Sequence, residues 1–173
     1  MTALILVADG FEDLTLFLPW YRLREEGVNT QLAAPFLHAV EGAHGYQVEP
    51  DQRIDDVNPA DFDLLLIPDG SSSEILRQYE GAVGIVRTFL DEGNRVATIG
   101  HGAQLLISSG ALDGRPVTCA AGIRDDVRAA GGVYRDLACV TDVNLLTGRG
   151  ADDLPEFMRA LCRLLAGRTT STR

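Results

Sequence analysis

Five short apolar runs, each bounded by turn-forming residues, constrain the fold of this chain more than any other feature. They cover residues 3–8, 30–35, 63–68, 96–100 and 115–119. Because their apolar residues follow one another directly instead of alternating with polar ones, each run is typical of a strand buried on both faces. Strands of this kind belong to parallel sheets that helices cover on both sides.

Helical patterns separate these apolar runs. The expected helices cover residues 12–26, 74–92 (in one piece or two), 101–110, 122–131 and 152–166. Strands that alternate with helices predict an α/β sandwich around a mostly parallel sheet. The irregular stretch 38–57 is predicted to form a short antiparallel excursion at one edge of that sheet.

The length of 173 residues suits one domain, which we expect over residues 1–168, followed by a polar tail at 169–173. A formal net charge of -10 gives an acidic surface that repels phosphate backbones and anionic lipids, so neither nucleic acid nor a membrane is expected as a partner. The sequence contains no lysine, which excludes Schiff-base chemistry and a P-loop lysine.

Three cysteines, at positions 119, 139 and 162, form an odd set without CxxC spacing. They predict neither a disulfide framework nor a metal site, and we expect them to be small core residues in a reducing compartment. The N-terminal apolar run ends after about seven residues, too short for a signal peptide or a membrane span. A cytoplasmic location is therefore expected. We also expect the protein to use no cofactor.

Three turns that follow predicted strands carry polar residues. They read ADGFED after the first strand, PDGSSSE after the third and GHGAQ after the fourth. Ligands of parallel α/β sheets bind where the carboxyl ends of the strands meet helix N-termini. We therefore expect Glu12, Asp69 and His101, one from each turn, to converge on one site.

The GHGAQ turn allows three interpretations. Gly100 and Gly102 begin a dinucleotide fingerprint, but Leu105 stands at its third glycine, and no following strand ends in an acid at the expected distance of about 20 residues. Alternatively, the glycines only permit tight packing. A strand–turn–helix elbow, whose amides polarise a carbonyl or a carboxylate, is favoured because His101 directly follows the apex.

The PDGSSSE turn has two interpretations. Asp69 and Gly70 end the strand. In one interpretation, the serines and Glu74 only cap the following helix. In the other, the Glu74 carboxylate orients the imidazole of His101.

Three further residues are weaker candidates. His44 is expected to be a hydrogen-bonding loop histidine, and Asp126 to favour the start of a helix. Cys119, at the end of a predicted strand, either faces the site or is a buried, inert thiol.

In this order, the turns resemble those of the DJ-1/PfpI superfamily, and most of all its PfpI branch. The matching stretches are VADGFEDLTLFLPWYRLREEG, HGYQVEPD, DFDLLLIPDGSSSEILR, VATIGHGAQLLISSGALDGRPVT, GIRDDVRAAGG and GRGADDLPEFMRALCRLL. The resemblance implies a flavodoxin-like three-layer sandwich and homodimers or higher oligomers that complete the sites at subunit interfaces. It also implies that His101 is the site histidine and that Glu74 approaches it from a neighbouring subunit.

Four positions depart from the pattern of this family. Gly100 stands where the family has its nucleophilic cysteine, and Thr15 where it has the glutamate that tunes the thiol. Asp69-Gly70 replaces a glycine pair whose amides help to form an oxyanion hole, and Ala120 lies near a position that is often aromatic. Gly100, Thr15 and Ala120 are all smaller than the residues that the family has at or near these positions, so we expect a wider pocket. In that pocket, the missing side chain at Gly100 is expected to leave space for a ligand.

Covalent thiol chemistry cannot start at Gly100. What remains is His101 as acid/base, Glu74 or Asp69 as its partner, and amides near Gly70 and Gly102 as anion stabilisers. This set predicts proton transfer, hydration, elimination or cyclisation of a carbonyl-containing small molecule, in a specialised metabolic pathway. The alternatives are a non-catalytic ligand-binding or stress-associated protein and, less favoured, a cysteine hydrolase or glyoxalase that uses Cys119.

Overall fold

The structure, a computed structural model, describes residues 1–167 and centres on a seven-stranded sheet. The strands run in the order β10–β11–β7–β6–β1–β2–β5, and only β10 pairs antiparallel with its neighbour. They are β1 (Thr2–Leu6), β2 (Asn29–Ala34), β5 (Gln52–Arg53), β6 (Leu64–Ile67), β7 (Arg95–Ile99), β10 (Cys139–Asp142) and β11 (Leu145–Gly148). The expected mostly parallel sheet is confirmed. The expected tail, 169–173, lies outside the described residues.

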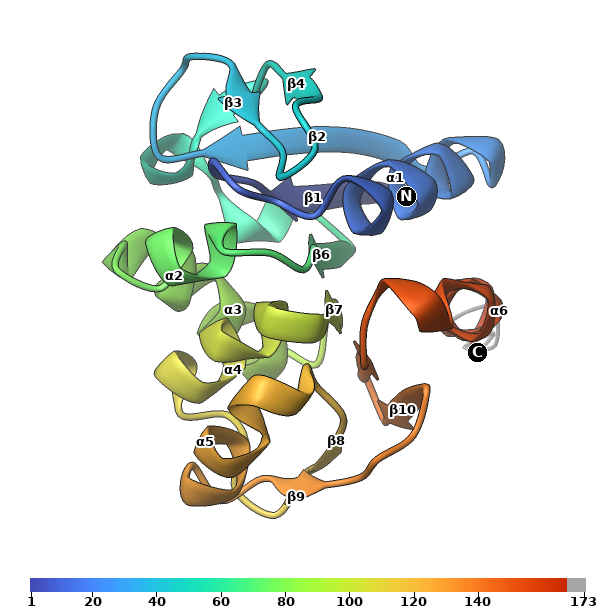
Figure 1. Cartoon of the computed structure of the whole chain (residues 1–173). Helices are drawn as coiled ribbons and strands as arrows, with labels where there is room; N and C mark the ends of the chain where they lie inside the picture. The colour runs from blue at the N-terminus through green and yellow to red at the C-terminus, as the bar shows by residue number, and fades with distance from the viewer. Residues whose placement is uncertain (168–173) are drawn as a thin grey trace.

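Helices cover both faces of this sheet (Figure 1). The helices α1 (Asp13–Glu25) and α6 (Leu154–Ala166) lie on one side, and α2 (Ser72–Leu76), α3 (Glu80–Asp91), α4 (Ala103–Ser109) and α5 (Arg124–Ala129) on the other. Short 3-10 helices cover Ile54–Asp56, Pro59–Asp61, Gly100–Gly102, Ala121–Ile123 and Ala151–Asp153.

Strand β1 shows why consecutive apolar residues predict this arrangement. Leu4 and Leu6 point into the core beneath α3, α4 and α5, whereas Ala3 and Ile5 point into the core beneath α1 and α6. All four side chains are fully buried. A strand between two helical layers needs an apolar residue at every position, because successive side chains face opposite sides of the sheet.

Two parts of the sheet differ from the prediction. The run 115–119 contributes only β8 (Pro116–Val117), which pairs with β9 (Val133–Tyr134) in a separate two-stranded sheet. Instead, β11 and β10 extend the main sheet beyond β7, and β11 is fully buried. Their sequences, CVTD and LLTG, are short and partly polar, so their apolar signal was too weak to identify them.

The remaining differences are small. The helical stretch 74–92 forms two pieces, α2 and α3, and the excursion 38–57 forms an antiparallel pair, β3 (Val40–Glu41) and β4 (Gln47–Val48), before β5 joins the main sheet. Cys119 is fully buried, Cys139 is partly buried and packs against the core, and Cys162 is partly buried. Every helix within residues 1–167 falls short of the length and apolar character that crossing a bilayer requires.

Candidate functional site

Three turns lie together at the carboxyl edge of the sheet, after the adjacent strands β1, β6 and β7. The first turn is joined to the second because the Glu12 N–H donates to the Asp69 carbonyl oxygen at 2.8 Å. The second is joined to the third because the His101 N–H donates to Asp69 Oδ1 at 2.7 Å. The structure therefore brings Glu12, Asp69 and His101 together at one place.

His101 and Asp69 form an imidazole–carboxylate pair. The ring nitrogen Nδ1 lies 2.8 Å from Asp69 Oδ1, and the side chains of His101 and Asp69 are 40% and 15% exposed. The carboxylate thus lies beneath a ring that reaches solvent. When Nδ1–H donates to a carboxylate, the ring orientation is fixed and Nε2 is left as the nitrogen that can meet a ligand.

Each group of this pair stabilises the charged form of the other. Burial disfavours the charged form of Asp69, but hydrogen bonds from His101 and Gly70 outweigh burial, so the pKa of the carboxyl is lowered. The hydrogen bond to Asp69 raises the pKa of His101; burial opposes this rise, and the charges of Asp69 and Glu74 add to it. Neutral solution therefore contains a larger protonated fraction of His101 than of an ordinary histidine.

The space beside Gly100 is filled, which corrects the expectation that the apex leaves room for a ligand. Gly100 has a positive φ of 55°, as a tight elbow requires. A Cβ on this residue would lie 2.1 Å from Asp69 Cγ and 2.1 Å from Asp69 Oδ2. The Asp69 carboxylate therefore occupies the volume that a side chain at residue 100 would need.

The Gly70 amide, which was expected to stabilise a ligand anion, is also engaged within the chain. The Gly70 N–H donates to Asp69 Oδ1 at 2.7 Å, alongside the N–H and Nδ1 of His101. Gly102 is buried against the backbone of β6, where a Cβ would lie 2.8 Å from the Ile67 carbonyl oxygen. The glycine at 102 therefore serves tight packing, and the donors near Gly70 serve Asp69.

Thr15 and Glu12 form hydrogen bonds with the backbone of Asp69. Thr15 is fully buried, and its hydroxyl accepts the Asp69 N–H at 3.0 Å while donating to the Glu12 carbonyl oxygen at 2.9 Å. Glu12 caps α1, because its Oε2 accepts the Thr15 N–H at 2.8 Å. Both residues hold the turn that carries Asp69, and Thr15 presents no surface to a ligand.

Glu74 lies near His101 within the same chain. It is exposed on α2, and its charge contributes to the raised pKa of His101. This effect acts within one chain, and the approach of Glu74 from a neighbouring subunit, which the resemblance implies, stays a prediction.

Ala120 borders a cavity of about 420 Å³ beside the elbow. Gly148 of β11 pairs with Ile99 of β7, so the segment from Arg149 onward leaves the sheet next to Gly100. The sequence did not single out this segment, because β11 itself was missed. The cavity is lined by Ala120, Ala121, Arg149, Gly150, Ala151, Asp152 and Asp153.

Cys119 precedes α5, and Asp126 lies on that helix. Cys119 is fully buried in the core beneath α3, α4 and α5, and burial raises the pKa of its thiol to about 12. Asp126 is exposed on α5, where its charge acts on Cys119. A buried thiol with such a pKa is inert, so the structure favours the second interpretation of Cys119.

His44 belongs to a second imidazole–carboxylate pair. Its Nδ1 lies 3.1 Å from Asp13 Oδ2, and Asp13 also accepts the backbone N–H groups of His44 and Tyr46. Burial disfavours the Asp13 charge, but these hydrogen bonds outweigh burial and lower the pKa of the carboxyl. Asp13 therefore organises the loop that carries His44, a role its sequence position at a helix start did not reveal.

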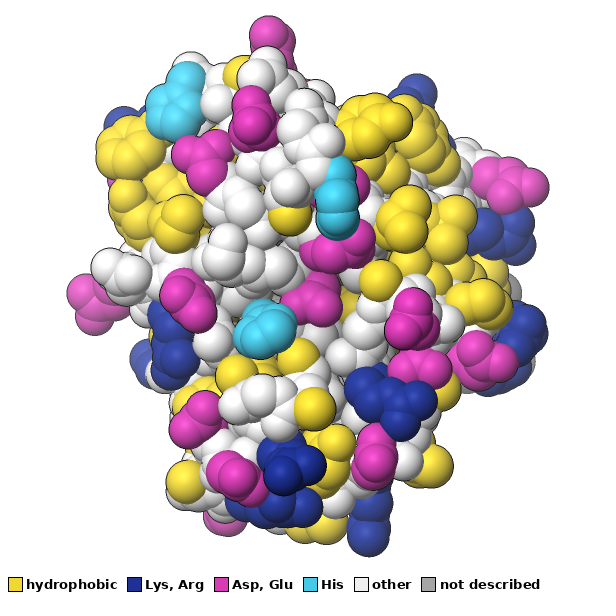
Figure 2. Space-filling model, in the orientation of Figure 1, with side chains coloured by type: hydrophobic (Ala, Val, Ile, Leu, Met, Phe, Trp, Pro, Cys, Tyr) yellow, Lys and Arg dark blue, Asp and Glu magenta, His cyan; other side chains and the backbone are white. Residues whose placement is uncertain are grey.

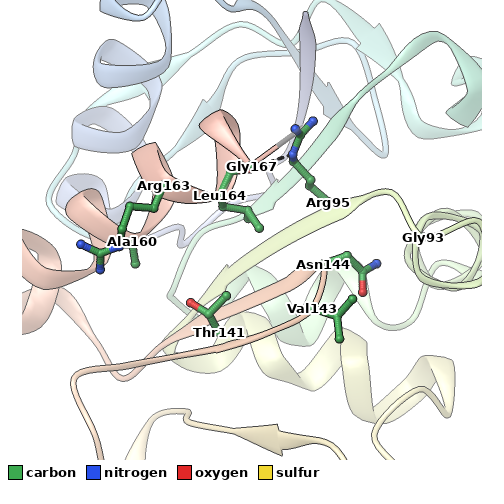
Figure 3. Close-up of a pocket in the computed structure, with 9 residues that line it drawn as sticks. All are labelled: Gly93, Arg95, Thr141, Val143, Asn144, Ala160, Arg163, Leu164 and Gly167. Carbon is green, nitrogen blue, oxygen red and sulfur yellow. Dashed lines mark hydrogen bonds between the residues drawn. The ribbon is translucent and has the colours of Figure 1, made fainter. Parts of the chain in front are cut away.

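The remaining surface features are groups of acidic and hydrophobic side chains and a second cavity. On the face shown in Figure 2, acidic side chains lie near the histidine rings, and hydrophobic side chains gather in two areas away from the middle. A cavity of about 430 Å³ is bordered by α6 and the loop between β10 and β11, with Leu164 on one side and Val143 on the other (Figure 3). Within the described part of the chain, no group of three or more His, Cys, Asp or Glu side chains forms a metal site.

Comparisons with known proteins agree with the fold described above. The profile of the DJ-1/PfpI family matches residues 1–164. The protein named deglycase PfpI of Pyrococcus furiosus is 44% identical over 165 residues, which are 95% of this chain and 99% of that protein. Protein/nucleic acid deglycase 2 of Escherichia coli is 38% identical over 164 residues, 93% of this chain and 95% of that one. The crystal structure of Drosophila melanogaster DJ-1beta superposes with a TM-score of 0.88 at 25% identity, covering 96% of this chain and 91% of that chain.

Proposed function

Because the chain belongs to the DJ-1/PfpI family, we propose that it acts on a small carbonyl compound through His101 and Asp69, without a covalent thiol intermediate. The observation that carries this proposal is the 2.8 Å hydrogen bond between His101 Nδ1 and Asp69 Oδ1. It orients the ring and directs Nε2 away from the carboxylate, as the aspartate does in serine hydrolases.

The raised pKa of His101 gives Nε2 an acid role. A protonated ring can donate from Nε2 to a carbonyl oxygen, while the proton on the adjacent carbon passes to a carboxylate or to water. No bond to the protein forms in such a transfer. Hydration, elimination and cyclisation use the same proton donor, so they belong to the same class of proposed reactions.

The absence of a thiol at residue 100 is the reason for proposing non-covalent chemistry. Thiohemiacetal and thioester intermediates need an exposed thiolate, and Gly100 has no side chain. Cys119 does not replace it, because its thiol is fully buried and its pKa is raised to about 12. The cysteine hydrolase or glyoxalase alternative therefore has no support in this geometry.

The cavity beside Ala120 is the proposed place for the body of the substrate. Its volume of about 420 Å³ suits a small metabolite, and its small residues Ala120, Ala121 and Gly150 leave it open. The names of two relatives, both deglycases, support a reaction at a sugar-derived or carbonyl-derived group.

His101→Gln tests the mechanism. We expect turnover of a panel of aldehydes and ketones, followed by proton NMR in deuterated water, to fall by about 10²–10⁴-fold. His44→Gln is the matched control, because it removes the imidazole of the other histidine–aspartate pair. Unchanged turnover in His101→Gln would refute the proposed role of His101.

A non-catalytic, ligand-binding or stress-associated role is the second candidate. The observation that favours it is the engagement of the Gly70 and His101 amides by Asp69, which prevents them from binding a developing oxyanion. Incubation with a metabolite mixture separates the two functions: a binding protein would retain one compound unchanged, whereas an enzyme would consume one and release its product.

We also propose that the chain forms a homodimer or a higher oligomer, in keeping with its family. Exposed apolar side chains on α1 support this proposal, with Leu14 61%, Leu18 46% and Tyr21 58% exposed. Burying such residues in a subunit interface would remove apolar surface from water. Sedimentation velocity measures the assembly directly, and a monomer at all accessible concentrations would contradict the proposal.

A further inference from the structure

Three hydrogen-bond donors from two turns converge on one oxygen atom, Asp69 Oδ1. The Gly70 N–H is at 2.7 Å, the His101 N–H at 2.7 Å and His101 Nδ1 at 2.8 Å. Two of the donors follow β7 and one follows β6, so the tertiary structure assembles them. Such a group of donors suits a carboxylate oxygen, and here the chain supplies that oxygen itself.

The backbone of Asp69 is fixed on both sides, which directs its carboxylate to this place. Its N–H donates to Thr15 Oγ1 at 3.0 Å, and its carbonyl oxygen accepts the Glu12 N–H at 2.8 Å. The carboxylate also fills the volume beside Gly100, where a Cβ would lie 2.1 Å from Asp69 Cγ. Asp69 therefore occupies both the donors and the adjacent space.

A ligand carboxylate meets two obstacles at this site. It would have to replace Asp69 at the three donors, and it would approach the negative charges of Asp69 and Glu74, both of which act on His101. His101 Nε2 is not one of the three donors, so a carbonyl group can accept a hydrogen bond from it without displacing Asp69.

We infer that these three donors form a carboxylate-binding site that Asp69 itself occupies, so that the wild-type chain excludes a ligand carboxylate from this position. This inference concerns binding alone and stands apart from the proposed function. It follows that removing the Asp69 side chain creates a site for a small carboxylate, because the three donors then have no partner in the chain.

Formate binding tests this inference without requiring turnover. The imidazole Cε1–H signal of His101, assigned with His101→Gln, is followed by NMR during titration with sodium formate, against sodium chloride at equal ionic strength. We expect Asp69→Gly to bind formate with a dissociation constant at least about tenfold lower than that of the wild type. Formamide, which is uncharged, should show no such gain.

Two further variants make the test decisive. Asp9→Gly is the matched control, because it removes an exposed carboxylate after β1 and leaves the three donors occupied, so its formate affinity should equal that of the wild type. Asp69→Ser is the substitute if Asp69→Gly fails to fold. Equal formate affinity in the wild type and the Asp69 variants would overturn the inference, as would an equal gain in Asp9→Gly. Loss of the proposed activity alone would leave the binding result intact.

Discussion

Gly100→Ala is predicted to destabilise the protein by far more than an alanine in a left-handed turn normally does. The added methyl would lie 2.1 Å from Asp69 Cγ and 2.1 Å from Oδ2, distances at which the atoms cannot coexist. The carboxylate must move away, and movement breaks its bonds to Gly70 and to both donors of His101.

The magnitude follows from two contributions to the free energy of unfolding. A residue with a Cβ in the left-handed region costs about 1–2 kcal/mol. A lost hydrogen bond to a charged group costs about 1.5–3 kcal/mol, and we count only one because the carboxylate regains water when it moves. The sum is about 2.5–5 kcal/mol, a large part of the stability of a domain of this size.

A control variant and a double-mutant cycle separate these contributions. Gly110 has a positive φ of 73°, and no atom lies within 4 Å of the position that a Cβ would take there, so Gly110→Ala reports the backbone strain alone. In an Asp69→Gly background, Gly100→Ala should cost only that strain. The coupling between positions 69 and 100 is therefore expected at about 1.5–3 kcal/mol.

Urea denaturation followed by circular dichroism measures all five proteins: the wild type, the three single variants and the double variant. The midpoint and slope together give each free energy of unfolding. Additivity of the two substitutions within about 0.5 kcal/mol would refute the placement of the Asp69 carboxylate beside Gly100.

Two further predictions concern titration and thiol reactivity. The lowered pKa of Asp69 stabilises the folded protein at pH values above the pKa of an unfolded aspartate, about 3.9, and this stabilisation is lost as pH falls through the pKa of the folded state. The raised pKa of His101 stabilises the folded protein at pH values below the pKa of an unfolded histidine, about 6.5, and this stabilisation is lost as pH rises through the pKa of the folded state. The difference in unfolding free energy between the wild type and Asp69→Asn should therefore peak between about pH 4 and 6.5, and a pH-independent difference would contradict the pairing. Iodoacetamide should modify Cys139 and Cys162 before Cys119, because Cys119 alone is fully buried and its pKa is raised to about 12; peptide mass spectrometry would show early Cys119 labelling if this is wrong.

Much of the fold could be predicted because strands buried on both faces leave a strong local signal. The runs that became β1, β2, β6 and β7 are apolar over successive residues, and the helices between them have regular apolar spacing. Strands β10 and β11 carry polar residues such as Asp142 and Thr147, so their pairing depends on contacts that no local pattern encodes. The contribution of Arg149 and the residues after it to the cavity beside Ala120 was missed for the same reason.

The sequence alone brought three of the polar turns to one edge of the sheet. Glycine at 100 allows the positive φ of the elbow, and the turns after β1, β6 and β7 place Glu12, Asp69 and His101 at one edge of the sheet. Only the tertiary structure decided what these residues do to one another. Removal of bulk at Gly100 predicted an open pocket, but the Asp69 carboxylate from the neighbouring turn fills that volume and engages the nearby amides. Side chains from distant positions compete for space and for donors in three dimensions, and residue size at one position cannot show which of them occupies the gap.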